Sequence, residues 1–127
     1  MTELNFEDII GRYFNLNLKK DNYRIYVEEA GQGTPLLCLH TAGSDGRQFR
    51  HILNDKRITN NYRVIVFDLP WHGKSNPPEG YELKDYKLTT NLYKEIIMSF
   101  CKQYKLIDPV IMGCSMGGRV VLSLIHI

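Results

Sequence analysis

The segment from Gly113 to Gly118 sets a serine between glycines at a spacing that suits nucleophilic catalysis. It reads Gly-Cys-Ser-Met-Gly-Gly, so Ser115 has a glycine two positions before it and another two positions after it. A serine hydroxyl that attacks a carbonyl carbon must project from a sharp turn, where side chains at those two positions would collide. Gly113 and Gly117 remove those side chains. The pattern predicts that Ser115 is a nucleophile that forms a covalent acyl intermediate.

The residues after Ser115 could stabilise the charge that develops in such a reaction. An apolar stretch compatible with a helix follows the serine. The N-terminus of that helix would point at the site, so the backbone N–H of Met116 could face a developing oxyanion. Five-residue patterns of this kind also occur by chance in loops, so the interpretation depends on the rest of the chain.

Two further polar segments begin where an apolar run ends. Residues 40–44 follow the run at 36–39, and residues 68–75 follow the run at 64–67. Ligands of open α/β sheets bind at the carboxyl ends of the strands. We therefore expect both segments beside Ser115.

The elements that must position these segments differ along the chain. A short amphipathic helical turn is expected over residues 5–12. Residues 14–18 and 23–27 alternate apolar with polar side chains, which predicts an antiparallel hairpin. This hairpin is expected to form one side of the sheet.

After the hairpin, the apolar residues no longer alternate with polar ones. Runs without alternation at 36–39, 64–67 and 110–112 predict central strands that are covered on both faces. Apolar residues at helical spacing within 85–105 predict a helix packed on the sheet. The sequence thus predicts an α/β fold, with a mostly parallel sheet, an N-terminal antiparallel hairpin and helices on both faces.

Over roughly residues 35–121 the three segments resemble the α/β-hydrolase family and occur in the family's order. The resemblance implies that residues 1–121 form the N-terminal part of an α/β-hydrolase domain. It also implies that the loop after residue 39 supplies the second backbone N–H of the oxyanion hole. Ala42 is the first candidate for that donor, and Thr41 is the adjacent one.

The same resemblance assigns structural roles to the loop after residue 67. The family pattern D-x-x-G-x-G-x-S is met at Asp68, Gly73 and Ser75, but Trp71 takes the place of the first glycine. The family uses the aspartate to hold the loop, so we expect Asp68 and Gly73 to shape it. His40 and His72 are likewise expected to bond within their loops and not to act as bases.

The residues after Ser115 do not complete a catalytic triad in the family's order of serine, acid and histidine. His126 follows along a helix by about ten residues, roughly 15 Å, and is not expected to be the base. The chain by itself is therefore expected to be inactive. Leu122 to Ile127 resemble the translation of CTG-TCT-CTT-ATA-CAC-ATC, the end of a transposase adapter, so we expect the domain to end near residue 121 and residues 122–127 to be an adapter-derived tail.

The charge composition indicates which classes of partner the chain is expected to bind. Its 127 residues carry 16 basic and 14 acidic side chains, a net charge of +2, in no long run of one sign. This disfavours nucleic acid and membrane surfaces as partners. The first residues lack the pattern of a secretory signal, so a cytoplasmic protein is expected.

Cysteine and histidine spacing gives little support to a metal site. Cys38, Cys101 and Cys114 form no Cys-x-x-Cys pair, and the four histidines show no ligand spacing. We expect the cysteines to be small buried hydrophobic residues, with Cys114 pointing from its turn into the core. Neither a metal nor an organic cofactor is expected.

These observations predict a hydrolase that cleaves a carboxylic ester or lactone, a small molecule with a carbonyl group, through an acyl-serine. Within the family, hydrolysis of carbon–carbon bonds and cofactor-free haloperoxidase chemistry are alternatives that share the serine turn. A dehalogenase would call for aspartate at position 115. The alternative from another class is a non-catalytic protein whose hydrolase-like pocket serves as a small-molecule receptor.

Overall fold

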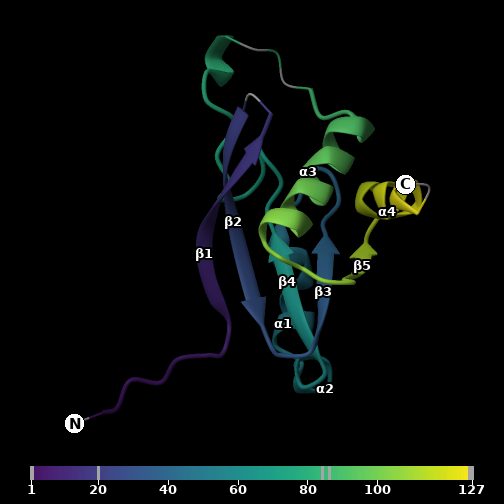
Figure 1. The fold of residues 1–127 in the computed structure, drawn as a ribbon. Coiled ribbons are helices and arrows are strands. Elements are labelled where there is room, and N and C mark those ends of the chain that lie inside the picture. The colour runs from purple at the N-terminus through teal and green to yellow at the C-terminus, as the bar shows by residue number, and fades with distance from the viewer. Residues whose placement is uncertain (1, 20, 84, 86, 126–127) are drawn as a thin grey trace.

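The computed structural model describes residues 2–19, 21–83, 85 and 87–125. Within these residues one sheet has the strand order β1-β2-β4-β3-β5 (Figure 1). Its strands are β1 (Ile10–Leu18), β2 (Asp21–Ala30), β3 (Thr34–Leu39), β4 (Tyr62–Phe67) and β5 (Val110–Gly113). β1 pairs with β2 and β2 with β4 in antiparallel directions, whereas β3 runs parallel to both β4 and β5. The sheet is therefore mixed, with the hairpin on one side as predicted.

Helices cover both faces of the sheet. They are η1 (Gly46–Phe49), α1 (Arg50–Leu53), α2 (Lys56–Thr59), η2 (Tyr81–Leu83), α3 (Thr90–Gln103) and α4 (Met116–Leu124). Figure 1 shows α3 lying across one face, with α4 beside it. Side chains of η1 and α1 join the apolar cluster on the other face. None of the helices among the described residues is long and apolar enough to cross a membrane.

Burial on both faces explains the apolar run of β3. Leu37 and Leu39 lie in the cluster that contains Phe100 of α3, whereas Cys38 lies in the cluster that contains Phe49 of η1. Successive residues of a strand point to opposite faces, so a strand between two helical layers has no polar side. Burial also raises the pKa of the Cys38 thiol to about 12. The structure confirms the predicted fold class.

Two predicted boundaries differ from the structure. The helical turn expected over residues 5–12 is wrong, because β1 begins at Ile10, which pairs with Glu29 of β2. Pairing with a neighbouring strand satisfies the backbone there, and this tertiary contact overrides a weak local pattern. The helix expected over 85–105 begins at Thr90, since the Thr89 hydroxyl accepts a hydrogen bond from the Leu92 N–H at 3.1 Å and caps it.

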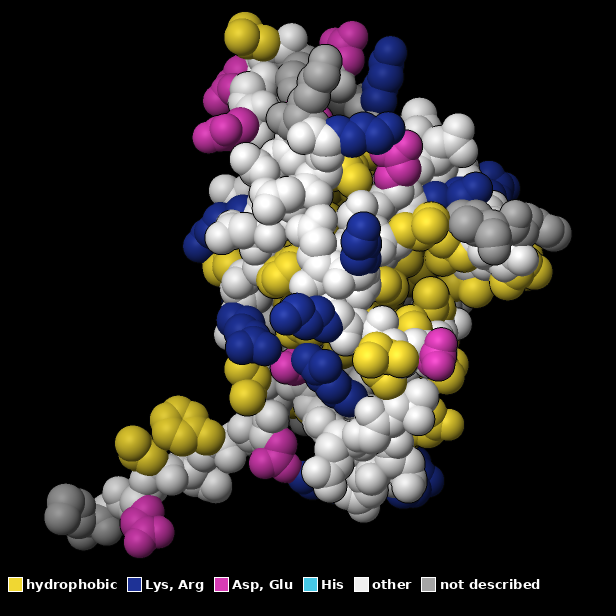
Figure 2. Space-filling view, in the orientation of Figure 1, with side chains coloured by type: hydrophobic (Ala, Val, Ile, Leu, Met, Phe, Trp, Pro, Cys, Tyr) yellow, Lys and Arg dark blue, Asp and Glu magenta, His cyan; other side chains and the backbone are white. Residues whose placement is uncertain are grey.

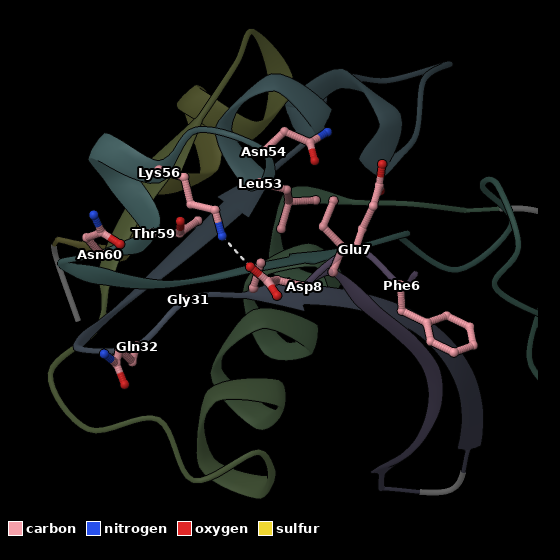
Figure 3. A pocket seen from close by; sticks show the side chains of 12 residues that line it. Phe6, Glu7, Asp8, Gly31, Gln32, Leu53, Asn54, Lys56, Thr59 and Asn60 are labelled. Carbon is pink, nitrogen blue, oxygen red and sulfur yellow. Dashed lines mark hydrogen bonds and ion pairs between the residues drawn. The ribbon is translucent and has the colours of Figure 1, made fainter. Parts of the chain in front are cut away.

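A cleft of about 430 Å³ lies at the amino ends of the parallel strands β3 and β4, and residues 6–9 of the N-terminal segment form part of its lining (Figure 3). Its walls include Gly31 and Gln32 just before β3, and Asn60 just before β4. An ion pair between Asp8 and Lys56 bridges it, and the Lys56 hydrogen bond lowers the pKa of the Asp8 carboxyl. This cleft lies at the amino ends of the parallel strands, whereas Ser115 follows the carboxyl end of β5 and lies at the opposite end of the strands.

The side of the molecule formed by β5 and α4 is apolar. Figure 2 shows hydrophobic side chains gathered on this side. Val110 of β5 is 47% exposed and Leu122 of α4 is 65% exposed. Among the described strands β5 pairs only with β3. It is therefore an edge strand with an uncovered apolar surface.

Candidate active site

Ser115 occupies a sharp turn between a strand and a helix. β5 ends at Gly113 and α4 begins at Met116, and between them Ser115 has φ 54° and ψ −111°. A positive φ is uncommon for any residue other than glycine and marks a strained turn. The serine is exposed at this turn. The structure thus agrees with the predicted strand-to-helix position of Ser115.

The two glycines that flank the serine are sterically required. A Cβ atom added to Gly113 would lie 2.3 Å from the carbonyl carbon of Gly117. One added to Gly117 would lie 2.4 Å from the carbonyl oxygen of Leu39. Both distances are far below van der Waals contact with backbone atoms that cannot swing away. The spacing of the pattern therefore reflects close packing of the turn against α4 and β3.

The turn is bonded directly to the end of β3. The Cys114 N–H donates to the Leu39 carbonyl oxygen at 3.2 Å, and Leu39 is in register with Gly113. Because β3 and β5 are parallel, the residues that follow both strands leave the sheet at the same edge. Ser115 and Thr41 each lie two residues beyond this matched pair. The sheet therefore brings the loop after β3 to the serine.

The loop after β3 has two backbone donors of different availability. The Thr41 N–H donates to the side-chain oxygen Oε1 of Gln48 at 3.0 Å. Ala42, the other predicted donor, is exposed beside it. The bond to Gln48 favours Ala42 over Thr41 as a donor to a ligand. The sequence did not point to Gln48, because a glutamine seven positions after Thr41, within the short helix η1, belongs to no recognisable pattern.

His40 joins the loops after β3 and β4. Its ring is fully buried, Nε2 accepts a hydrogen bond from the Leu69 N–H at 3.0 Å, and Nδ1 lies 2.8 Å from the Thr41 carbonyl oxygen. These partners require the neutral tautomer with the proton on Nδ1. Burial lowers the pKa of the His40 imidazole, which favours the same form. With both nitrogens engaged, His40 holds the loops together.

Asp68 organises the loop after β4 from inside. Its carboxylate is buried and accepts hydrogen bonds from the Gly46 N–H at 2.7 Å and the Lys74 N–H at 2.9 Å. The Ser75 hydroxyl donates to the Asp68 carbonyl oxygen. A Cβ atom at Gly73 would lie 2.3 Å from Asp68 Oδ2, so the loop closes tightly over the carboxylate. These contacts are the ones that a loop-holding role for Asp68 and Gly73 needs.

Trp71 has a backbone conformation that suits glycine. Its φ is 66°, at the position where the family pattern has its first glycine, and Gly73 follows with φ 53°. The left-handed region costs an L-residue roughly 1–2 kcal/mol. His72 stabilises the turn, because its N–H donates to the Leu69 carbonyl at 2.9 Å and its Nδ1 lies 3.0 Å from the Pro70 carbonyl oxygen. The loop thus keeps the glycine geometry with a tryptophan in place.

An open cleft of about 560 Å³ lies between the two loops. It is lined by Ala42, Gly43, Ser44 and Asp45 of the first loop and by Trp71, His72 and Gly73 of the second. The rings of His40 and His72 have centroids 5.2 Å apart, so the second loop packs on the residue that begins the first. The cleft therefore borders Ala42, which the sequence predicted as a donor, and Trp71.

The cysteines have different environments. Cys114 was expected to point into the core, and this expectation is wrong, because the residue is exposed. It follows β5, whose outer edge has no paired strand among the described residues, so nothing is packed over it. Cys101 is half-buried in α3, and burial raises its pKa to about 11. Only Cys38 is fully buried, as expected for all three.

Two other predictions concern metals and His126. In the part of the chain that the structure describes, no group of three histidine, cysteine, aspartate or glutamate side chains could hold a metal ion. His126 lies outside the described residues, and α4 is described to its end at Leu124.

Comparisons with known proteins agree with this fold. Residues 34–126 match the family model described as the alpha/beta hydrolase fold. The AB hydrolase superfamily protein YisY of Bacillus subtilis (strain 168) is 29% identical over 106 residues, which are 81% of this chain and 36% of that protein. The magnesium-chelatase 30 kDa subunit of Rhodobacter capsulatus is 32% identical over 92 residues, which are 72% of this chain and 30% of that protein.

A solved structure agrees with these sequence matches. The N-acyl homoserine lactonase AidH, complexed with N-butanoyl homoserine, superposes with a TM-score of 0.74 at 31% identity. The match covers 91% of this chain and 40% of that one. The chain thus spans about a third of the length of the curated relatives named above and two fifths of the lactonase.

Proposed function

The chain belongs to the α/β hydrolase family, and on that premise we propose that the protein containing it hydrolyses a carboxylic ester or lactone through an acyl-serine on Ser115. The observation that carries the proposal is the turn itself. Ser115 has φ 54° between two glycines that leave no room for a side chain. Such a turn exposes a hydroxyl at the end of a strand, where a carbonyl can approach it.

The reaction that these groups support has two steps. Ser115 Oγ bonds to the carbonyl carbon, its proton passes to a base, and the carbonyl oxygen becomes an oxyanion that accepts hydrogen bonds from the Met116 and Ala42 N–H groups. The tetrahedral intermediate collapses, the bond to the alkoxy oxygen breaks, and that oxygen takes the proton. Water then attacks the acyl-serine, which releases the carboxylic acid and restores the hydroxyl.

We assign the base and its orienting carboxylate to residues beyond this chain. The family's order places both after the serine. His40 is unsuitable, because both of its ring nitrogens are bonded within the loops. Asp68 is not assigned as the orienting acid, because it precedes Ser115 in the chain and its buried carboxylate binds the Gly46 and Lys74 N–H groups of the loops. An unassisted serine hydroxyl is a weak nucleophile, so we expect the chain alone to react slowly.

The lactone class draws support from the solved lactonase, which shares 31% identity over 91% of this chain. A lactone is an internal ester, so the same nucleophile and oxyanion donors serve both substrates. The cleft beside Ala42 is open and lined by both loops, which suits a small organic molecule.

The experiment that tests the nucleophile is covalent labelling with a fluorophosphonate, located by mass spectrometry. We expect slow labelling of the chain, confined to Ser115 and absent from Ser115→Ala. Ser123→Ala is the matched control, because Ser123 is a half-buried hydroxyl of α4 that bonds to the Arg119 carbonyl, and it should not change labelling. Equal labelling of several serines would contradict the assignment.

The rate of labelling tests the assignment of the base. A rate typical of an intact serine esterase would show that a residue of this chain acts as the base. In a longer protein that supplies acid and histidine, Ser115→Ala should lower kcat by about 10⁴-fold or more. A smaller loss there would count against an acyl-serine.

A further inference from the structure

Trp71 combines a strained backbone with a large side chain at the edge of the candidate site. Its φ of 66° is one that a glycine adopts without strain. A glycine could therefore form the same turn. The backbone conformation alone does not call for a tryptophan, so the packing of its side chain bears on its role.

The surroundings of the indole point to a ligand. Trp71 is half-buried and packs against the apolar cluster on the α3 face of the sheet, which fixes one side of the ring. It also lines the open cleft of about 560 Å³, together with Ala42 and Gly43 of the loop after β3. An aromatic ring held by packing on one side and facing a cleft offers a rigid apolar wall.

Trp71 shares its cleft with Ala42, a residue of the predicted oxyanion hole. Ala42 borders the same cleft as Trp71, and the loop that carries Ala42 leaves the sheet next to Ser115. A substrate carbonyl bound to the Ala42 N–H would place one of its two substituents along the cleft. An apolar acyl chain fits that position, because each methylene that leaves water strengthens binding by up to roughly fourfold.

We propose that Trp71 forms an acyl-chain subsite and is a specificity-determining residue for substrates with an apolar acyl group. The proposal rests on the proposed function, because it assumes a carbonyl substrate at Ser115. It goes further by naming the part of the substrate that is selected and the side chain that selects it. The backbone at position 71 suits glycine, so a tryptophan there is strained. In this proposal the strain is accepted because the aromatic ring binds the acyl chain.

The chain reports on this subsite directly, because Trp71 is its single tryptophan. The experiment titrates the chain with homoserine lactone and its N-butanoyl, N-hexanoyl and N-octanoyl derivatives while Trp71 fluorescence is recorded. We expect a saturable change for the acylated lactones, with an apparent Kd at least about fourfold tighter for octanoyl than for butanoyl. The lactone without an acyl group should give no saturable change.

Two variants separate selection from a structural role. Equilibrium dialysis measures binding without fluorescence, and circular dichroism checks that each variant is folded. Trp71→Phe should keep the dependence on chain length, whereas Trp71→Gly should lose it while the glycine keeps the turn. Equal affinity for all lactones in the unchanged chain, or an unchanged dependence in Trp71→Gly, would overturn the proposal.

Failure of the subsite and failure of the proposed function are distinguishable. If fluorophosphonate labels Ser115 but the change in Trp71 fluorescence does not depend on acyl-chain length, the subsite is wrong and the assignment of the nucleophile is retained. If the fluorescence depends on chain length but Ser115 is not labelled selectively, the cleft binds acyl groups and the nucleophile is wrong.

Discussion

The backbone N–H of Cys114 donates to the carbonyl oxygen of Leu39 at 3.2 Å, which ties the turn of Ser115 to the end of β3. This one bond places the serine and the loop that begins at His40 at the same edge of the sheet. The geometry of the candidate site therefore depends on how closely β5, its turn and α4 pack against β3.

Gly117→Ala should disrupt this packing. The added Cβ would lie 2.4 Å from the Leu39 carbonyl oxygen, so the turn or β3 must shift. We expect a loss of unfolding free energy of about 1–3 kcal/mol, measured by urea denaturation. Gly118→Ala is the control, because its Cβ would meet no atom closer than 3.3 Å. Similar losses in both variants would contradict the steric argument.

Asp68→Ala should destabilise the loop after β4. It removes the acceptor of the Gly46 and Lys74 N–H groups and leaves them unsatisfied, which costs about 2–3 kcal/mol of unfolding free energy. Asp68→Asn should also destabilise, because its NH₂ group would face one of those donors. The comparison is Asp55→Ala, which removes a more exposed cap of α2 and should cost only about 1 kcal/mol. Equal costs for Asp55→Ala and Asp68→Ala in thermal unfolding would refute the loop-holding role.

Lowering the pH should reduce the free energy of unfolding, because His40 becomes protonated. Burial lowers the pKa of this histidine in the folded state below its ordinary value of 6.5, so the unfolded chain binds the proton more readily. The stability that neutral His40 contributes is therefore complete above about pH 6.5 and is lost progressively below it. Urea midpoints at pH 7.5 and 5.5 should differ more for the unchanged chain than for His40→Gln. Equal differences would assign the acid sensitivity to other groups.

The chain of 127 residues should associate with itself through β5. Among the described strands β5 pairs only with β3, so its other side offers backbone groups and an apolar surface for pairing with a second copy. Val110→Lys should reduce the mass measured by light scattering at micromolar concentration. Met98→Lys is the control, because Met98 has a similar exposure, 46% against 47%, but lies on α3. A monodisperse monomer without substitution would contradict the prediction.

Local patterns in the sequence predicted the features of the site that depend on near neighbours. The glycines at 113 and 117 indicated a sharp turn at Ser115, because a Cβ atom at Gly113 would clash with Gly117 only four residues along the chain. The atom that excludes a side chain at Gly117 belongs to Leu39 of β3, so that clash depends on tertiary packing. The apolar runs indicated central strands, because burial on both faces leaves no polar position in a strand. These inferences needed only short-range sterics and periodicity.

Tertiary structure decided the features that depend on residues far apart in the chain. β1 replaced a predicted helical turn because β2 lies beside it, and Cys114 is exposed because no described strand covers the outer edge of β5. The Thr41 N–H is bonded because Gln48 returns to it across the loop. Trp71 keeps a glycine-like backbone because neighbouring groups hold its turn. Sequence periodicity carries no record of such contacts, since they form only when the sheet brings separate loops to one edge.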